Sequence, residues 1–295
     1  MAMAAKKSFE KSNNIEKRRE FEWREEDFIF LSGLLHERTG IVLTEKKKEM
    51  MYGRLVRRLR LLNISNFGDY CAYLKGPKGE VELGFTLNAI TTNTTNFFRE
   101  NHHFEFLEKT ILPPVRKKIN VNAHHHFRLW SAGCSSGQEP YSIAMVMRNI
   151  LGNSAKNSKI LATDLDSNML HTGKLGHYDA PSCQNTIPKI YHKYFTKGLK
   201  NLDGSLVAMT DDVKSLISFK QLNLLHDWPM KGKFDAIFCR NVMIYFDKET
   251  QDRLVRRYAK YLKPGGFLFV GHSESLLSVP DVYKCEGKTI YRVLT

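Results

Sequence analysis

The segment Ala132–Glu139, Ala-Gly-Cys-Ser-Ser-Gly-Gln-Glu, has the residue types of a turn that lets the backbone approach a ligand. It follows the apolar stretch Phe127–Ala132, and Gly133 and Gly137 leave room for close contact. Asp164 ends the next apolar stretch, about 27 to 31 residues beyond the two glycines, where a carboxylate can accept hydrogen bonds from ribose hydroxyls. The turn lacks the G-x-G-x-x-G pattern of dinucleotide enzymes, which favours a nucleoside without phosphate. The alternative is an ordinary strand-to-helix turn in which Asp164 caps the next helix.

Arg240 and Asn241 directly follow another apolar stretch, Phe234–Cys239. Because ligands of open α/β sheets bind beyond the carboxyl ends of the strands, two polar residues at such an end indicate a second wall of the same site. Tyr245 lies four residues after Asn241, and by itself it fits a half-buried structural aromatic equally well.

The segment Thr91–Arg99, Thr-Thr-Asn-Thr-Thr-Asn-Phe-Phe-Arg, is rich in hydroxyl and amide side chains. Such side chains commonly cap nearby backbone groups, which accounts for most of them. Arg99 is the informative residue, because a guanidinium fixed near a cleft can hold a carboxylate through two parallel hydrogen bonds.

A sheet must position these segments. Short apolar stretches that alternate with helical patterns predict an α/β fold with a mostly parallel, doubly wound sheet. We expect strands at residues 127–132, 159–163, 234–239 and 267–270, a helix with Pro140 at its first position, a helix at 249–262, and a hairpin at 283–294 that turns at Glu286-Gly287. Residues of about 176–219 break the alternation and predict a small inserted β-subdomain.

The region from Phe28 to about Ile90 has only helical spacing. We expect four helices there: the first ends at Gly40, the second opens at Thr44, the third opens at Ser65–Asn66, and the last spans Val81–Ile90. The predicted organisation is a basic tail at 1–22, a helical domain at 23–92 and a sheet domain at 93–295. The second helix carries Arg54, Arg57 and Arg60 in an outward row, with Arg58 alongside.

The composition limits the function classes. Lysine and arginine exceed acidic residues by 45 to 31, a net charge of +14, which favours an acidic partner such as nucleic acid, an anionic membrane or an acidic protein helix. No apolar run approaches the roughly 18 to 20 residues of a membrane span, and the first twenty residues lack the apolar core of a secretory signal. Five scattered cysteines without C-x-x-C spacing argue against disulfides, so we expect a cytoplasmic protein.

Histidines occur in two runs, His102–His103 and His124–His126. Adjacent histidines do not converge on one ion as i, i+4 pairs do, and no acidic or thiol partner stands at ligand spacing. We therefore expect no metal site, and a solvent-facing linker at the second run.

Several longer motifs occur in a fixed order: Asn93-x-Thr-x-Phe-Phe-Arg99, Trp130–Ser142, Ala162–Asp166, Phe234–Phe246, and Leu262–Gly266 with Gly271–Glu274. From about Phe28 to its end, the chain resembles the CheR-type chemotaxis receptor glutamate O-methyltransferases. The resemblance implies a small all-helical N-terminal domain, a Rossmann-like S-adenosylmethionine-dependent methyltransferase domain, and an inserted antiparallel β-subdomain.

The resemblance also implies a cofactor site, in which S-adenosyl-L-methionine and its product S-adenosyl-L-homocysteine contact Asn93, Thr95, Arg99, Gly133, Glu139, Asp164, Asn223, Leu224, Arg240 and Asn241. It implies that Glu139 meets the amino-acid end, that Asp164 meets the ribose, and that Asn223 and Leu224 lie by the adenine. Arg99 and Tyr245 are implied at the reacting carboxylate. Because a carboxylate is ionised at neutral pH, its methylation needs orientation and exclusion of water rather than a general base.

The implied partners are cytoplasmic helices of methyl-accepting chemotaxis receptors, docked on Arg54, Arg57, Arg58 and Arg60. Some family members also hold a receptor C-terminal tail at the β-subdomain by strand addition. Neither nucleic acid nor membrane insertion is expected. A nucleic-acid methyltransferase of the same fold predicts an Asn/Asp-Pro-Pro-Tyr/Phe segment or a Pro-Cys loop, and the sequence has neither. A catalytically silent adaptor is disfavoured by the presence of Arg99 and Tyr245.

Overall fold

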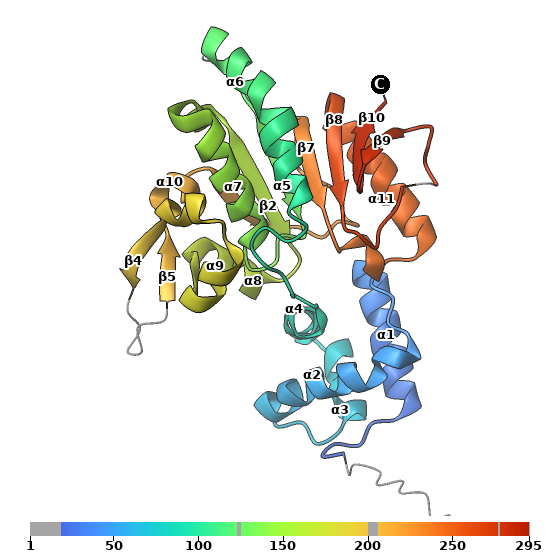
Figure 1. Ribbon diagram of the computed structural model, residues 1–295. Helices are drawn as coiled ribbons and strands as arrows, with labels where there is room; N and C mark the ends of the chain where they lie inside the picture. The colour runs from blue at the N-terminus through green and yellow to red at the C-terminus, as the bar shows by residue number, and fades with distance from the viewer. Residues whose placement is uncertain (1–18, 123–124, 200–205, 277, 295) are drawn as a thin grey trace, which may run out of the picture.

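The computed structural model of the chain (Figure 1) describes residues 19–122, 125–199, 206–276 and 278–294. Its centre is a seven-stranded sheet in the order β6-β2-β1-β7-β8-β10-β9. The first five strands in this order are parallel, and β10 runs antiparallel to both of its neighbours, β8 and β9. The strands are β1 (Arg128–Ala132), β2 (Lys159–Asp164), β6 (Ile217–Gln221), β7 (Phe234–Cys239), β8 (Leu262–Val270), β9 (Tyr283–Gly287) and β10 (Ile290–Val293). The predicted mostly parallel α/β sheet is confirmed.

Each face of the sheet has its own apolar core, because successive strand residues point to opposite faces. Phe238 of β7 packs in one core with residues of α5 and α7, whereas the adjacent Ile237 packs in the other core with residues of α11. The helices and helical turns of this domain are α5 (His102–Phe106), the π-helical η2 (Leu107–Ile111), α6 (Leu112–Val121), α7 (Gln138–Leu151), η3 (Gly152–Asn157), α8 (Ser167–Leu175), η5 (Met243–Tyr245) and α11 (Lys248–Tyr261). Burial on both faces explains the continuous apolar runs of the central strands.

The inserted subdomain is an antiparallel sheet in the order β3-β5-β4, as predicted. It contains β3 (His177–Asp179), α9 (Ala180–Thr186), η4 (Lys189–Tyr194), β4 (Phe195–Leu199), β5 (Leu206–Met209) and α10 (Asp211–Lys214). The main sheet resumes earlier than the expected boundary of 219. Ile217 and Phe219 of β6 pair in parallel register with Ile160 and Ala162 of β2.

The N-terminal domain is a helical bundle, as predicted. It consists of α1 (Glu25–Thr39), the 3-10 turn η1 (Glu45–Lys47), α2 (Lys48–Leu62), α3 (Phe67–Lys75) and α4 (Gly79–Ile90). Leu31, Met51, Leu55 and Phe67 are fully buried in its core. Gly40 ends α1 in the left-handed conformation, with φ of 71°. In Figure 1 this domain lies below the sheet domain.

Three local predictions need correction. Helix α7 begins at Gln138, so Pro140 is its third residue; the backbone N–H groups of a first turn lack helical partners, which makes proline acceptable there. The hairpin turns at Lys288 and Thr289, both with positive φ, rather than at Glu286-Gly287. Helix α2 opens at Lys48, because Thr44 precedes the 3-10 turn instead.

The predicted tail at residues 1–22 lies largely outside the described residues. Its last part contacts α2: the Phe21 N–H donates to the Tyr52 hydroxyl at 3.2 Å, and Arg60 donates to Glu20 at 2.9 Å. Of the predicted linker at residues 124–126, His124 also lies outside the described residues, and His126 is exposed. Among the described residues, no helix is both long and apolar enough to cross a membrane.

Candidate active site

A cavity of about 220 Å³ lies at the carboxyl ends of β1, β2 and β7, between the sheet domain and the helical domain. The structure brings every residue predicted for the cofactor or for the reacting carboxylate to the wall of this cavity. These residues are Asn93, Thr95, Arg99, Gly133, Glu139, Asp164, Asn223, Leu224, Arg240, Asn241 and Tyr245. Their individual roles remain predictions.

The turn after β1 is shaped by Gly133. Its φ is 89°, and a Cβ atom built on it would lie 2.3 Å from Cγ2 of Val242, so only glycine fits without displacement. The backbone N–H groups of Gly133 and Cys134 both donate to the carbonyl oxygen of Thr163, at 2.8 and 2.9 Å. These bonds hold the turn against the end of β2, and the close approach of Val242 places it beside the loop that follows β7.

Asp164 is fixed by backbone donors at the same edge. Its Oδ2 accepts from the Ser135 N–H at 2.7 Å, and its Oδ1 accepts from the Asp166 N–H at 3.0 Å. Burial raises the pKa of Asp164, and these backbone hydrogen bonds oppose the shift. The side chain that caps α8 is Asp166, which accepts from the N–H groups of Asn168 and Met169. Helix capping therefore does not explain Asp164.

Glu139 and Arg240 form a buried ion pair in the cavity wall. Nη1 of Arg240 lies 3.0 Å from Oε2 of Glu139, and only 2% of the Arg240 side chain is exposed. Oε1 of Glu139 accepts from the Ser131 hydroxyl at 2.7 Å. Burial raises the pKa of Glu139, and the Arg240 charge opposes this shift. The pair presents one carboxylate, already oriented, to the cavity.

The linker before α5 is tied to the turn after β1. Asn93 donates from Nδ2 to Oδ2 of Asp166 at 2.8 Å, and the Asn93 carbonyl accepts from the Ser135 hydroxyl at 2.9 Å. Arg99 donates to the carbonyl oxygen of Thr94 at 3.0 Å. Within the described ranges Arg99 has no carboxylate partner, so its remaining donors are available to a ligand.

Glu274, the last residue of the motif Gly271–Glu274, had no predicted role. The Glu274 carboxylate is buried and accepts from the backbone N–H groups of Gly271 at 2.6 Å, Asn241 at 2.9 Å and Ile244 at 3.3 Å. Asn241 has a positive φ of 58°. Glu274 therefore holds the loop that presents Asn241 and the half-buried Tyr245 to the cavity.

Two family descriptions together match nearly the whole chain. Residues 26–91 match the family described as "CheR methyltransferase, all-alpha domain", and residues 93–292 match "CheR methyltransferase, SAM binding domain". The chain belongs to the CheR methyltransferase family. The resemblance inferred from the motifs is confirmed.

Curated relatives extend over nearly the whole chain. It is 42% identical to the chemotaxis protein methyltransferase of Klebsiella aerogenes, over 90% of this chain and 88% of that protein. It is 40% identical to the chemotaxis protein methyltransferase of Salmonella typhimurium, over 88% and 86%. It is 39% identical to chemotaxis protein methyltransferase 2 of Pseudomonas aeruginosa, over 92% and 94%. This CheR family member is an S-adenosylmethionine-dependent methyltransferase of chemotaxis, and the nucleic-acid alternative is not favoured.

The helical domain of this CheR protein also lines the cavity, a contribution that was not predicted. The residues concerned are Thr39, Ile41, Val42, Leu43, Lys47 and Met50. The Val42 N–H donates to the Tyr245 carbonyl at 2.8 Å, and Nδ2 of Asn223 donates to the Arg38 carbonyl at 2.7 Å. Gly40 is a sequence signal for this contact between the two domains. A side chain at this position would collide with the sheet domain, because a Cβ atom there would lie 2.6 Å from Leu225.

The four arginines predicted for docking are in different environments. Arg58 is mostly buried and forms two hydrogen bonds with the buried Glu82, at 2.6 and 2.9 Å, so it is not part of an open basic face. Arg60 is exposed and pairs with Glu20. Arg54 donates to the Thr91 carbonyl at 2.8 Å. Arg57 is exposed and has no ion pair within the described part of the chain.

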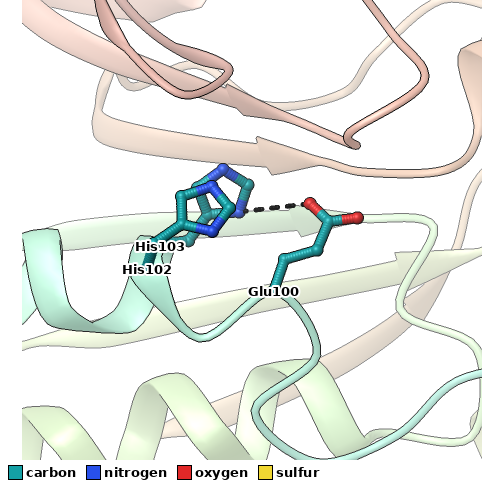
Figure 2. Close-up of side chains that lie close together, drawn as sticks. All are labelled: Glu100, His102 and His103. Carbon is teal, nitrogen blue, oxygen red and sulfur yellow. Dashed lines mark ion pairs between the residues drawn. The ribbon is translucent and has the colours of Figure 1, made fainter.

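Glu100, His102 and His103 come together (Figure 2), with one candidate ligand atom of each within 4.8 Å of the others. The premise that these histidines lack an acidic partner is therefore wrong. Oε2 of Glu100 lies 3.3 Å from Nη2 of Arg240, so the carboxylate already faces a cation, which would repel a metal ion at the same place. Burial lowers the pKa of His103 to about 3, so His103 is neutral near pH 7. That the chain holds no metal stays a prediction.

Proposed function

We propose that this chain transfers a methyl group from S-adenosylmethionine to the side-chain carboxylates of glutamates on chemotaxis receptors. The observation that carries the proposal is that Arg99 and Tyr245 line the same cavity as Glu139 and Asp164. In addition, no carboxylate among the described residues forms an ion pair with Arg99. A donor and an acceptor carboxylate can therefore be held in one site.

The cofactor residues fit a nucleoside with a charged amino-acid end. Glu139 offers an ionisable carboxylate to an ammonium group, Asp164 offers acceptors to the ribose hydroxyls, and Asn223 with Leu224 forms a polar and apolar wall for the adenine. The tight contact of Gly133 with Val242 keeps the turn close to such a ligand. Bound there, the sulfonium cofactor supplies an electrophilic methyl group.

The transfer needs no proton movement in this chain. A carboxylate oxygen forms a bond to the methyl carbon while the carbon–sulfur bond breaks. The electron pair of the broken bond stays on sulfur, so the sulfonium becomes a neutral thioether. Arg99 and Tyr245 orient the carboxylate, Arg99 through its free guanidinium donors and Tyr245 through its hydroxyl. Ile41 and Val42 of the helical domain help to exclude water from that side.

The receptor docks, we propose, as an acidic helix on the basic side of α2. Arg57 is the main contact, because it is exposed and lacks an ion pair within the described ranges. Arg54 and Arg60 flank it, and Arg58 supports the helix through Glu82 instead of touching the receptor. A receptor tail can extend the inserted sheet, whose edge strands are β3 and β4. The site of action is the cytoplasm, where the proposed receptor helices lie.

The experiment is to incubate the purified chain with methyl-labelled S-adenosylmethionine and receptor-rich membranes, and then to treat the product with alkali. A glutamate methyl ester releases labelled methanol, whereas a methylated nucleic-acid base does not, and a silent adaptor incorporates no label. Arg99→Ala should lower incorporation by orders of magnitude and weaken S-adenosylhomocysteine binding. Tyr245→Phe should lower incorporation with little change in that binding. Arg116→Ala, an exposed arginine on α6, is the matched control. Alkali-stable label would refute the proposal.

A further inference from the structure

We infer that Glu100 is a positioning residue for the amino-acid end of the cofactor, because it neutralises Arg240 and leaves the charge of Glu139 available to the ammonium group. The inference rests on the proposed function, since it takes Glu139 as the contact of that ammonium group. Glu100 itself does not line the cavity, whereas Glu139 and Arg240 do.

Arg240 lies between two carboxylates. Its Nη1 is 3.0 Å from Oε2 of Glu139, and its Nη2 is 3.3 Å from Oε2 of Glu100. Both carboxylate side chains are 11% exposed and the guanidinium side chain is 2% exposed, so solvent screens these charges little. A buried charge is costly unless it is compensated nearby. If Glu139 were its only partner, Arg240 would neutralise the negative charge that faces the cavity.

The three charged side chains of this cluster sum to one negative charge, which an entering cation would balance. Glu100 and Glu139 bring two negative charges and Arg240 brings one positive charge, which leaves one negative charge for an ammonium group. His103 does not change this sum, because burial lowers its pKa to about 3 and it is neutral near pH 7. Burial disfavours the ionised Glu100, but the hydrogen bonds from His272 and the charge of Arg240 outweigh it and lower the pKa of Glu100 to about 2. Without Glu100, the same cluster with an ammonium group would carry an excess positive charge.

Glu100 is held in place from outside the cavity. Its Oε1 accepts from Nδ1 of His272 at 2.9 Å and from the His272 N–H at 3.2 Å, and its backbone has a positive φ of 56°. Figure 2 shows its carboxylate extended toward His103, whose Nδ1 lies 3.7 Å from Oε2. Glu100 directly follows Arg99 in the sequence, so the chain places the charge-compensating carboxylate beside a residue that lines the cavity.

The test compares two ligands in calorimetric titrations of the full chain. S-adenosylhomocysteine carries the amino-acid end, and 5′-methylthioadenosine has the same nucleoside without it. In Glu100→Gln we expect the Kd of S-adenosylhomocysteine to rise about tenfold or more, as follows from losing one charge-assisted contact. The Kd of 5′-methylthioadenosine should stay within about twofold. Glu105→Gln is the matched control: Glu105 is an exposed carboxylate of α5, paired with Lys109, and its loss should change neither Kd.

An unchanged affinity of Glu100→Gln for S-adenosylhomocysteine would overturn the inference. Equal weakening of both ligands would also overturn it, because Glu100 would then support the whole site instead of the ammonium group. If Glu100→Gln does not fold, Glu100→Asp keeps the charge but withdraws it from Arg240, and it should show the same ligand selectivity with a smaller loss. The proposed function fails separately, if the unmodified chain binds neither ligand or if Glu139→Gln does not weaken S-adenosylhomocysteine.

Discussion

Replacing Gly133 with alanine tests how the turn after β1 is built. The residue has φ of 89°, and its added Cβ would lie 2.3 Å from Cγ2 of Val242. The left-handed backbone conformation costs an L-residue about 1 to 2 kcal/mol, and overpacking costs about 1 to 3 kcal/mol. Because valine has a stiff χ1 angle, rotation of Val242 relieves little of the overlap. We expect Gly133→Ala to lower the free energy of unfolding by about 2 to 5 kcal/mol.

Two variants separate these contributions. Gly265 also has a positive φ, 71°, but a Cβ atom there meets nothing within 4 Å, so Gly265→Ala should lose only about 1 to 2 kcal/mol. Val242→Ala removes the atom that Gly133→Ala would strike. The double variant should recover about 1 to 3 kcal/mol relative to the sum of the single variants. Urea unfolding of the four variants measures this coupling energy.

The same clash should reduce activity, because Val242 lies between Asn241 and the turn that carries Tyr245. Moving the contact from 2.3 Å to an ordinary 3.4 Å requires a shift of about 1 Å. A misplacement of that size can lower a rate by about 100-fold. Methyl transfer by Gly133→Ala should fall accordingly and should recover in part in the double variant. Strictly additive unfolding energies, with no recovery of the rate, would refute the reasoning.

Three further predictions concern the loop after β7, helix α2 and the buried histidine. Glu274→Gln removes the charged acceptor of three backbone N–H groups. Steady-state methyl transfer should therefore fall at least about tenfold, and the free energy of unfolding measured in urea should fall by about 2 kcal/mol. Full activity would contradict the role of this loop. Arg57→Glu should weaken receptor methylation and its salt dependence without changing stability. Arg58→Ala should lower the free energy of unfolding by about 2 to 4 kcal/mol, because it leaves Glu82 buried and unpaired. A stability loss in Arg57→Glu together with a purely docking defect in Arg58→Ala would refute this assignment. Burial lowers the pKa of His103 to about 3, so the unfolded state binds a proton at a higher pH than the folded state does. The free energy of unfolding should therefore fall by a few kcal/mol from about pH 6.5 toward pH 3. His103→Gln should flatten this pH dependence in urea unfolding, and an unchanged slope would count against the prediction.

The strands of the parallel sheet, and the residues that line the cavity at their carboxyl ends, could be predicted where the signals are local. A parallel strand buried on both faces is a short apolar run, and its carboxyl end is marked by the polar residues that follow, as at Asp164 and Arg240. The predicted insert ended at about residue 219 and so included the first residues of β6, Ile217–Gln221. Only the pairing of this strand with β2 places it in the main sheet.

Charge neighbours could not be read from spacing. Arg58 and Arg57 are adjacent on α2, yet the buried Glu82 of α4 engages only Arg58. Likewise, Glu100 meets Arg240, which lies about 140 residues further along the chain. Such contacts depend on how α4 packs on α2 and how α5 packs on the sheet, and periodicity within one segment carries no information on either.

The amino-acid sequence by itself determined the kind of chemistry. A glycine turn, an acidic strand end and an arginine beside a cleft identify the residue types of a site for a nucleoside and a carboxylate. They can be recognised because backbone geometry and hydrogen-bonding capacity belong to single residues and their near neighbours. The tertiary structure alone decided that the helical domain walls this cavity through Val42, that Glu274 holds the loop of Tyr245, and that Arg240 lies between two carboxylates. Distances between segments far apart in the chain arise from packing, and burial then determines which of those charges interact strongly.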